Sequence, residues 1–294
     1  MDTSLERQSS ASAGDGASAD LDTAQSVTTR VGDRLRAAIK GRDEVIELVL
    51  VALVADGHVL LEDYPGSGKT TLAKVLGESI TDDDGGGAAA EIVPFRRIQF
   101  TPDLLPSDVT GSSVFEVDTG KFVFRPGPLF AHVVLADEIN RTSPKVQAAM
   151  LEAMAEKQVT VDNQTYPLDE LFYVLATQNP IDLAGTYPLP TPQLDRFLFK
   201  IVMRHIARDA ELEVLEQYPQ RSQEVADELP TVTRSEVLAT RRAVREHVRI
   251  EPALREALVD LAGALREDRR VLQGTSTRSL VLALPALQAR AVMH

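Results

Sequence analysis

Five short apolar runs divide the chain into regular segments, and the apolar residues between them are mostly spaced as in helices. The runs lie at about residues 58–62, 95–100, 133–137, 172–177 and 197–203. Uninterrupted apolar runs of this length are typical of strands buried on both faces, as in parallel sheets covered by helices. The alternation therefore predicts an α/β fold in which a mainly parallel five-stranded sheet lies between two layers of helices.

The N-terminal part of the chain shows a different pattern. Residues 1–26 are mostly Ser, Ala, Gly, Asp and Thr, with almost no large apolar side chains. Because such a segment cannot bury enough surface to offset the entropy of ordering, we expect a disordered, low-complexity acidic tail. Amphipathic helices are expected after it, at about residues 27–39 and 43–55.

The C-terminal part of the chain changes character after about residue 206. No further strand runs are found there, and leucines recur at helical spacing, as at Leu254, Leu258, Leu261 and Leu265. We therefore expect two domains after the tail: an α/β core over residues 27–205 and an all-helical domain over residues 206–294.

Two β-hairpins are expected within the α/β alternation. Residues 114–117 and 122–124 flank an Asp-Thr-Gly-Lys turn, and residues 158–161 and 165–168 flank an Asp-Asn-Gln turn. They could be simple connections, but hydrophobic hairpins are unusual insertions in an α/β core. A separate run rich in Asp, Gly and Ala at residues 81–90 is expected to be a surface insertion.

Composition restricts the function classes. The chain has 294 residues and no cysteine, which excludes disulfides, thiol catalysis and Cys-ligated zinc and fits a reducing cytoplasm. Its net charge of -13 argues against a general nucleic-acid-binding or anionic-membrane surface. No apolar run reaches the roughly 18–20 residues that span a bilayer, so membrane insertion is not expected. The N-terminus also lacks the basic and apolar regions of a secretory signal.

The clearest chemical pattern joins the first apolar run to the helix that follows it. The candidate nucleotide-binding residues are Pro65, Gly66, Ser67, Gly68, Lys69, Thr70 and Thr71. Glycines between a strand and a helix allow backbone N–H groups to surround a phosphate. The charge of Lys69 suits the β- and γ-phosphates, and the Thr70 hydroxyl can bind Mg²⁺. The usual pattern begins with Gly where this chain has Asp63, but the strand–loop–helix context supports the assignment.

Two carboxylates stand at the end of the third apolar run. Asp137 ends the run, and Glu138 follows it. A strand end beside a phosphate loop is where Mg²⁺ needs an acidic group, so Asp137 is the candidate metal ligand, directly or through water. Glu138 is the candidate for polarising an attacking water. A solvated acidic turn is the alternative, and the presence of the phosphate loop favours the functional interpretation.

Three other polar residues are candidates, each with an alternative. Asn179 follows the fourth run and either reaches toward a γ-phosphate and water or begins a turn before Pro180. Arg196 precedes the fifth run and either acts on a neighbouring subunit's nucleotide or pairs with Asp195. Arg278 lies in the first turn of a helix, where a cation opposes the helix dipole, so it either has a phosphate partner or is solvated.

In this order, the motifs resemble those of the AAA+ ATPases, and specifically of the MoxR family. The stretches that carry the resemblance are residues 57–63, 97–108, 124–128, 136–141, 151–154 and 193–197. The likeness extends from about residue 27 to the end of the chain. It implies a P-loop NTPase fold, with a three-layer αβα core and a C-terminal helical lid.

The resemblance also implies a role for each candidate residue. Lys69 and Thr70 would belong to the Walker A motif, Asp137 and Glu138 to Walker B, Asn179 would be sensor 1, Arg196 the arginine finger in trans and Arg278 sensor 2, while Ile39 and Gly41 would lie against adenine. ATP and Mg²⁺ are the implied cofactors, with the metal near Thr70 and Asp137. The two hairpins would be the helix-2 insert and the pre-sensor-1 hairpin, which face the central pore of such rings.

The function that the resemblance implies is a cytoplasmic, ATP-hydrolysing motor that forms a homo-oligomeric ring, expected to be a hexamer. Similar proteins remodel or mature a protein client in a chaperone-like way, for example during metal cofactor insertion, and often work with a partner that carries a von Willebrand factor A (VWA) domain. The alternatives are a nucleotide-binding scaffold with little turnover, a DNA-acting AAA+ motor and a relative of the magnesium-chelatase ATPase subunit. The acidic charge argues against the second and the residues Gln99 to Asp103 against the third.

Two features depart from the family pattern. The family usually has Glu where this chain has Thr191, which affects an expected subunit contact. The sequence also ends at His294, in or just after the sensor 2 helix, so the lid is expected to be incomplete.

Overall fold

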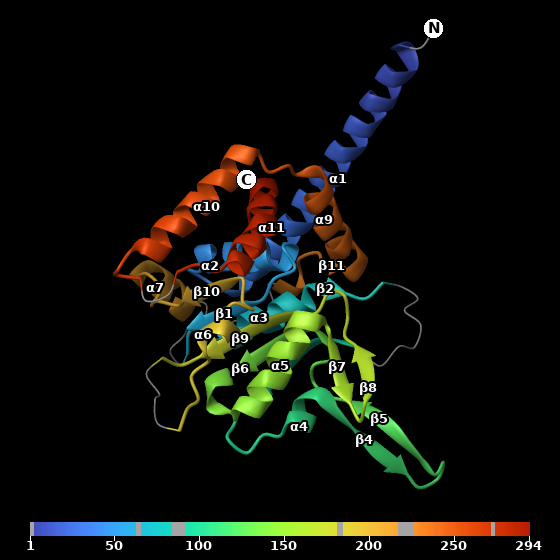
Figure 1. Cartoon of the computed structure of the whole chain (residues 1–294), viewed down its shortest axis with the longest axis vertical. Helices are drawn as coiled ribbons and strands as arrows, with labels where there is room; N and C mark the ends of the chain where they lie inside the picture. Colours follow the sequence, from blue (N-terminus) through green and yellow to red (C-terminus); the bar gives the residue numbers. More distant parts are fainter. Residues whose placement is uncertain (1–2, 63–65, 84–91, 181–184, 217–225, 272–273) are drawn as a thin grey trace.

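The computed structural model describes residues 3–62, 66–83, 92–180, 185–216, 226–271 and 274–294. Its central sheet has five strands in the order β10, β1, β9, β6, β3, and every neighbouring pair is parallel. The strands are β1 (Val59–Glu62), β3 (Val93–Gln99), β6 (Ala131–Asp137), β9 (Tyr173–Gln178) and β10 (Phe199–Val202). The five predicted strands and their parallel arrangement are confirmed (Figure 1).

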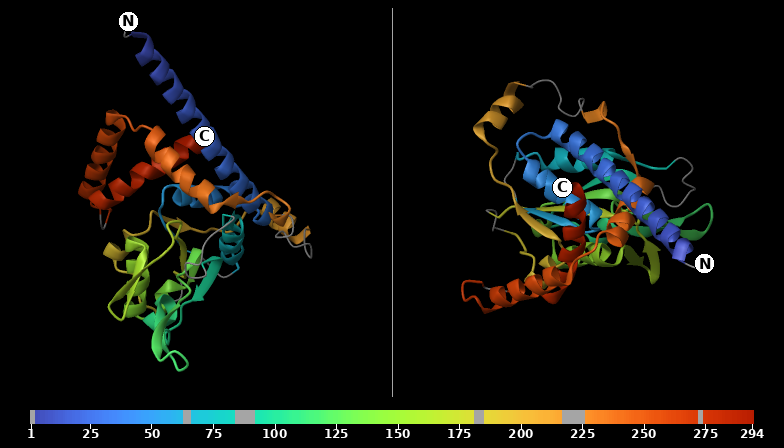
Figure 2. Two further views of the ribbon diagram at one scale, coloured as in Figure 1. Left: turned by 90° about the vertical axis from the view of Figure 1, so that its right-hand side faces the viewer. Right: turned by 90° about the horizontal axis from the view of Figure 1, so that it is seen from above.

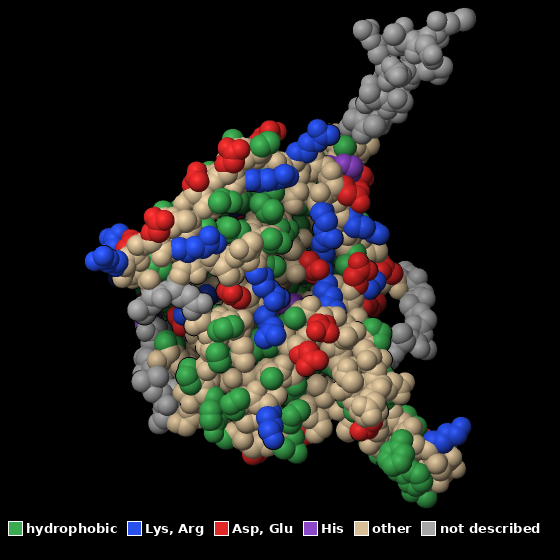
Figure 3. All heavy atoms as spheres, in the orientation of Figure 1, with side chains coloured by type: hydrophobic (Ala, Val, Ile, Leu, Met, Phe, Trp, Pro, Cys, Tyr) green, Lys and Arg blue, Asp and Glu red, His purple; other side chains and the backbone are tan. Residues whose placement is uncertain are grey.

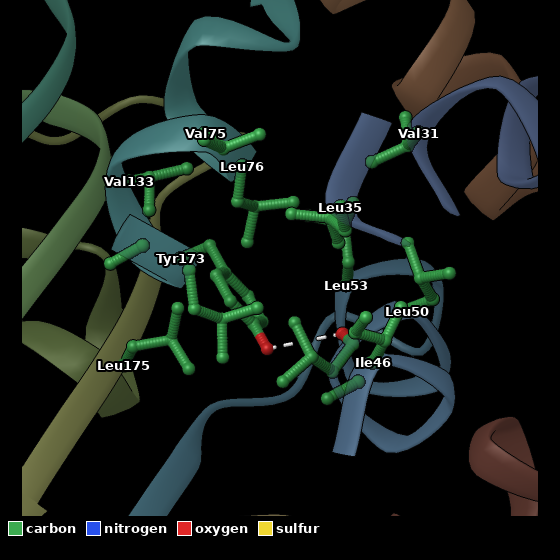
Figure 4. Close-up of a cluster of buried hydrophobic side chains, with 14 of the residues drawn as sticks. Val31, Leu35, Ile46, Leu50, Leu53, Val75, Leu76, Val133, Tyr173 and Leu175 are labelled. Atoms are coloured by element: carbon green, nitrogen blue, oxygen red, sulfur yellow. Dashed lines mark hydrogen bonds between the residues drawn. The ribbon is translucent and has the colours of Figure 1, made fainter. Parts of the chain in front are cut away.

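Alternate residues of each strand face opposite layers of helices, as the two-residue period of a strand requires. Leu61 and Tyr173 pack in the first cluster, where the Tyr173 hydroxyl donates to the Val49 carbonyl oxygen at 3.1 Å (Figure 4). Leu60 and Val174, their immediate neighbours, pack in the second cluster. The first layer contains α1 (Thr3–Ala38), α2 (Asp43–Val54) and α3 (Lys69–Glu78), and the second contains α4 (Pro106–Thr110) and α5 (Pro144–Glu156).

The parallel arrangement brings the carboxyl ends of all five strands to one edge of the sheet. β1 leads into the glycine loop at this edge, and β6 ends there at Asp137. In register, Glu62 at the end of β1 lies opposite Gln178 of β9, and Gln99 at the end of β3 lies opposite Asp137. Residues that are far apart in sequence therefore meet at a single site.

The N-terminal segment differs from its predicted structure. Instead of a disordered tail over residues 1–26, helix α1 runs without a break from Thr3 to Ala38. The packed face of this helix includes Ala24 and Val27, which are buried. Once that part is fixed, each further residue adds one backbone hydrogen bond, so the helix can continue from it. The N-terminal part of α1 extends away from the body of the protein (Figure 2).

The C-terminal part is mainly helical, as predicted, with one exception. A two-residue strand, β11 (Val232–Thr233), pairs in parallel with β2 (Ile80–Thr81). A strand this short leaves no recognisable run in the sequence. The Thr233 side chain then caps the next helix and accepts a hydrogen bond from the backbone N–H of Glu236. The helices here include α7 (Arg208–Glu216), α9 (Arg234–His247), α10 (Pro252–Glu267) and α11 (Thr277–Met293).

Both predicted hairpins are confirmed. The first consists of β4 (Gly111–Glu116) and β5 (Lys121–Pro126), and the second of β7 (Gln158–Val161) and β8 (Gln164–Pro167). Their bases touch, because the ring of Phe124 stacks on the ring of Tyr166 with centroids 3.8 Å apart. The first hairpin projects from the body and ends in an apolar tip, visible at the lower right of Figure 3. Most of the predicted surface insertion, residues 84–90, lies outside the described residues.

Candidate functional site

The glycine loop adopts the backbone conformation that its sequence predicts. Gly66 and Gly68 have φ values of 89° and 91°, in the left-handed region that suits glycine. Gly68 is the N-cap of α3, which begins at Lys69 and continues through Thr70 and Thr71. The first backbone N–H groups of α3 lack intrahelical partners, so this helix end suits an anion. Pro65, which was also predicted to belong to the loop, lies outside the described residues.

A cavity of about 500 Å³ lies beside the loop. Gly66, Ser67, Gly68 and Thr71 of the loop line it, and so do the polar side chains of Lys40, Arg42, Arg204, His205 and Glu211. The apolar part of the lining is formed by Ile39, Met203, Ile206, Val214 and Leu215. The lining thus offers backbone donors that suit phosphates together with apolar side chains that suit a base, the two kinds of surface that a nucleotide needs.

Gly41, predicted to lie near the base, is placed beside this cavity. It has a φ of 67°, and a Cβ at this position would come within 2.7 Å of the Ala210 Cβ in α7. A glycine is therefore required for the connection between α1 and α2 to approach α7 so closely. An ion pair between Lys40 and Glu213 at 3.2 Å joins the same two segments. The sequence analysis did not assign α7 to this site. The signal that could have indicated it is the pair of apolar residues Val214 and Leu215, which line the cavity.

Asp137 and Lys69 come together at the edge of the sheet. The Lys69 Nζ lies 3.3 Å from the Asp137 Oδ1, which also accepts a hydrogen bond from the Thr177 hydroxyl at 2.7 Å. On the other oxygen, Oδ2, Asp137 accepts hydrogen bonds from the Nη2 of Arg97 at 2.6 Å and from its Nε at 3.2 Å. This nearly inaccessible carboxylate is thus paired with two cations and one hydroxyl.

The charge state of Asp137 follows from these contacts. Burial by itself would raise the pKa of Asp137, but the hydrogen bonds from Arg97 and Thr177 and the charge of Lys69 outweigh it and hold the pKa below its usual value. Asp137 is therefore ionised at neutral pH, as a metal ligand must be.

Glu138 is held by three other residues. It has a φ of 59°, and its backbone N–H donates to the Thr177 Oγ1 at 2.9 Å. The Glu138 Oε2 accepts a hydrogen bond from the Gln99 Nε2 at 2.9 Å and lies 3.3 Å from the Arg141 Nε. The 3₁₀ turn η1 (Ile139–Arg141), which follows directly, supplies that arginine. The positive φ turns the carboxylate toward the edge of the sheet, where these two partners hold it.

The other predicted site residues lie around this centre. Asn179 follows β9, and its carbonyl oxygen accepts a long hydrogen bond of 3.5 Å from the Asn140 Nδ2. Arg196 is half-buried, its Nε has no hydrogen-bond partner, and among the described residues no ion pair joins it to Asp195. Arg278 is exposed in the first turn of α11, whose N-cap is Ser276. The structure therefore does not bring Arg278 into the lining of the cavity.

Several residues of the site were missed by sequence reasoning. Thr177 lies inside an apolar strand and showed no signal of its own. Arg97 and Gln99 share one face of β3, and Arg141 follows the two carboxylates. Only the order of the strands places β3 next to β6, so the sequence alone could not assign these partners to Asp137 and Glu138.

The residues present fit a magnesium–nucleotide complex. Thr70 and Asp137 offer the oxygen ligands that Mg²⁺ prefers, at the loop that would hold the phosphates. Across the described ranges, no cluster of three or more His, Asp or Glu side chains forms a separate metal site. A metal here would thus share phosphate oxygens with the protein ligands, which is usual for Mg²⁺ in phosphoryl-transfer sites.

Comparisons with known proteins agree with this geometry. Residues 58–199 match the family model described as ATPase family associated with various cellular activities (AAA). YeaC of Bacillus subtilis, an uncharacterized protein, is 44% identical over 262 residues, which cover 89% of this chain and 78% of the relative. Protein MoxR of Methylorubrum extorquens is 31% identical over 278 residues, covering 86% of this chain and 77% of the relative.

Two further comparisons extend these findings. Chaperone MoxR1 of Mycobacterium tuberculosis is 43% identical over 181 residues, covering 60% of this chain and 44% of the relative. A crystal structure of a proposed ATPase from Cytophaga hutchinsonii matches with a TM-score of 0.80 at 34% identity, covering 95% of this chain and 83% of that chain.

The glycine loop, the parallel sheet and the paired carboxylates define a P-loop nucleotide-binding protein of the AAA class. Together with Protein MoxR of Methylorubrum extorquens and the Cytophaga hutchinsonii structure, both matched over more than two thirds of their length, they show that the chain belongs to the MoxR family of AAA+ ATPases. None of the helices in the described ranges combines the length and apolar composition needed to cross a bilayer.

Proposed function

We propose that this protein binds ATP with Mg²⁺ and hydrolyses it as a MoxR-type motor. The observation that carries the proposal is the contact between Lys69 and Asp137, 3.3 Å apart beside a cavity with both polar and apolar lining. In the proposed complex, Lys69 and the loop amides bind the phosphates, and Thr70 and Asp137 hold the metal. The metal would neutralise charge on the phosphates when bound.

The proposed hydrolysis depends on positioning rather than on covalent chemistry. Glu138 orients the attacking water and polarises it, and Asn179 lies at the neighbouring strand end to contact water or the γ-phosphate. Glu138 is paired with Gln99 and Arg141 in the structure, so it must leave at least one of them to reach a water molecule. Hydrolysis therefore includes a rearrangement of the Glu138 side chain.

A ring would complete the site with groups from a second subunit. Arg196 supports this proposal, because its half-buried Nε has no hydrogen-bond partner among the described residues, and buried polar groups normally have one. We assign it as the finger that stabilises charge on the neighbouring subunit's nucleotide. Arg278 is the proposed sensor 2, although it would have to approach the nucleotide through a movement of α11 or from another subunit. A hexamer is the ring that we propose.

The first hairpin is the proposed contact with a protein client. Val114, Phe115, Val117 and Phe122 are exposed by 44%, 51%, 83% and 73%, and together they form the apolar tip in Figure 3. Exposed apolar groups of this kind mark contact surfaces. We propose that they grip an unfolded or partly folded chain in the pore. The name of the relative Chaperone MoxR1 supports a remodelling role.

The wider role that we propose is cytoplasmic maturation of protein complexes, such as those that receive a metal cofactor, together with a VWA-domain partner. These points depend on membership in the MoxR family and go beyond the geometry of the site.

The proposal is tested by steady-state ATP hydrolysis over a series of protein concentrations, with wild type, Glu138→Gln and Lys69→Ala. We expect activity per subunit to rise with concentration in the wild type, because each site needs a neighbour. Glu138→Gln should bind ATP without turnover, and Lys69→Ala should lose binding. Binding without turnover by the wild type at every concentration would instead support a nucleotide-binding scaffold. Stimulation by DNA would support a DNA-acting motor.

A further inference from the structure

Arg97 contacts Asp137 in a way that the roles assigned above do not use. It belongs to β3, the edge strand, where its Cα lies opposite Leu135 of β6. From there its guanidinium reaches along the sheet to the Asp137 Oδ2, at 2.6 Å from Nη2 and 3.2 Å from Nε. The Arg97 side chain is 46% exposed, whereas that of Asp137 is only 3% exposed. A partly exposed cation thus caps a buried carboxylate.

This contact occupies the side of Asp137 that the Walker A lysine does not reach. Lys69 and Thr177 approach Oδ1, and Arg97 approaches Oδ2. Charge-assisted hydrogen bonds of this kind are the strong ones in proteins. A divalent cation that bonds to Asp137, directly or through its water shell, therefore competes with Arg97 for the same oxygen. Since Arg97 is partly exposed, it can swing out without opening the core.

The same guanidinium also reaches the partner of Glu138. Its Nη2 donates to the Gln99 Oε1 at 2.6 Å, and the Gln99 Nε2 donates to the Glu138 Oε2 at 2.9 Å. An amide has one acceptor end and one donor end. By binding the acceptor end, Arg97 directs the donor end of Gln99 toward Glu138. The carboxylates of Asp137 and Glu138 are thereby connected through Arg97 and Gln99.

We propose that Arg97 is a positioning residue that stands at Asp137 in place of the divalent cation. While it is there, it keeps Gln99 turned toward Glu138; when the cation arrives, Arg97 leaves and Gln99 no longer has a fixed orientation. Binding of the metal thereby weakens the contact of Gln99 with Glu138 and leaves the contact of Glu138 with Arg141 in place. The inference rests on the proposed function, because it assumes that a magnesium–nucleotide complex binds at this site.

The test measures how Mg²⁺ changes the affinity for fluorescent mant-ADP, so it needs no turnover. The variants are Arg97→Met, which removes the charge, and Arg97→Lys, which keeps a cation but loses the two-point contact. Arg96→Met is the matched control, because Arg96 is an exposed arginine on the same strand whose side chain faces the opposite way. The Mg²⁺ concentration at half-maximal effect should fall about three- to tenfold in Arg97→Met, because a charge-assisted competitor is lost.

Arg97→Lys should give a midpoint between those of Arg97→Met and the wild type, and Arg96→Met should match the wild type. An unchanged or raised midpoint in Arg97→Met, with mant-ADP still bound, overturns the inference and leaves the proposed function standing. If the wild type does not bind mant-ADP with or without Mg²⁺, both the inference and the proposed function are wrong.

Discussion

Thr177 shows how a single hydroxyl can connect the two carboxylates of the candidate site. It donates to the Asp137 Oδ1 and accepts from the backbone N–H of Glu138, and it is completely buried. A hydroxyl can do both because it has one donor and two lone pairs. The sequence shows it only as a polar interruption near the end of an apolar run, so its role became visible only when β9 was placed beside β6.

Thr177→Val should therefore damage the site without changing its shape. The change removes one hydrogen bond from the buried Asp137 Oδ1, which keeps Lys69, and leaves the partly buried Glu138 N–H without this acceptor. The free energy of unfolding should therefore fall by about 1–3 kcal/mol. Loss of the hydrogen bond should also raise the pKa of Asp137 and lower the rate of ATP hydrolysis. Urea unfolding and steady-state kinetics measure the two effects. Thr177→Ser, which keeps the hydroxyl, is the control, and equal stability of the Val and Ser variants would contradict the prediction.

His58 gives a prediction about the dependence of stability on pH. It is buried between β9 and the end of α5: its Nδ1 accepts from the Val174 N–H, and its Nε2 lies 3.1 Å from the Met154 carbonyl oxygen. Both contacts are satisfied by the neutral ring. Burial lowers the pKa of His58 to about 4.

Because the pKa of an unfolded histidine is near 6.5, the unfolded state binds the proton more tightly. Stability is therefore full above pH 6.5 and is lost as the pH falls toward 4, by up to roughly 3 kcal/mol. His58→Gln should be less stable at pH 7 but should lose less stability between pH 6.5 and pH 4. Denaturant unfolding at several pH values measures the difference, and parallel curves for the two proteins would show that His58 does not contribute.

At the scale of elements, the hairpins and strands were predicted because local residue types determine them. The β4–β5 hairpin has its glycine turn at Gly120, with a φ of 63°, and apolar alternation on both sides. The same local argument was wrong for residues 3–26, because packing of Ala24 and Val27 fixes one part of α1 and the helix continues from there. It also missed β11, whose two residues are ordered by pairing with β2.

The base of the first hairpin depends on a glycine that the sequence did not single out. Gly111 has a φ of 99°, and a Cβ there would lie 2.4 Å from the Arg125 carbonyl oxygen and 2.6 Å from the Gly127 nitrogen. Since both neighbours are backbone atoms, they cannot move aside without distorting the hairpin.

Gly111→Ala should thus lower the protection of the β4–β5 amides in hydrogen exchange and lower stability by more than about 1–3 kcal/mol, because a clash is added to the strained φ. Gly120→Ala is the matched control, since the φ is also positive but a Cβ would meet no atom within 4 Å. Its effect should be about 1 kcal/mol. If the two variants behave alike, the close approach at Gly111 is not important.

At the scale of the whole molecule, α9 connects the C-terminal helices to the core. Arg241 is buried in the contact, where its Nε donates to the Leu53 carbonyl oxygen at 2.9 Å and its Nη1 lies 2.5 Å from the Asp56 Oδ1. Arg30 of α1 pairs with Glu236 at the other end of α9. The boundary predicted near residue 206 therefore marks a change in the sequence pattern, across which α9 is still joined to the core by these contacts. Movement of residues 206–294 as a lid stays a prediction.

The sequence predicts those parts of the site that are formed within one chain, but not a contact between two subunits. The glycine loop and the carboxylates follow from local motifs, and the contacts of Arg97 and Gln99 follow from the strand order. Arg196 belongs to neither group, because its Nε lacks a hydrogen-bond partner among the described residues. Its proposed role concerns an interface between subunits, so it must be tested with an experiment on the assembled ring.

Mixing two inactive variants provides that experiment. Arg196→Ala keeps Glu138 but lacks the proposed arginine finger. Glu138→Gln keeps that arginine but lacks the carboxylate proposed to polarise the attacking water. Each should lose at least about 10³-fold in turnover by itself, as expected for loss of an arginine finger or of the group that acts on water. In a ring with head-to-tail interfaces, random mixing in equal amounts joins an intact Glu138 to a neighbour's intact Arg196 at about one quarter of the interfaces. Activity should therefore recover to about one quarter of the wild-type rate.

The control for this experiment is a mixture of Arg196→Ala with the double variant that carries both changes, because no interface in it is complete. It should stay inactive although the same number of rings forms. Recovery in the first mixture and not in the second would establish that Arg196 acts across the interface. Co-assembly without recovery would mean that Arg196 serves its own subunit, and the proposed ring mechanism would then need another residue in trans.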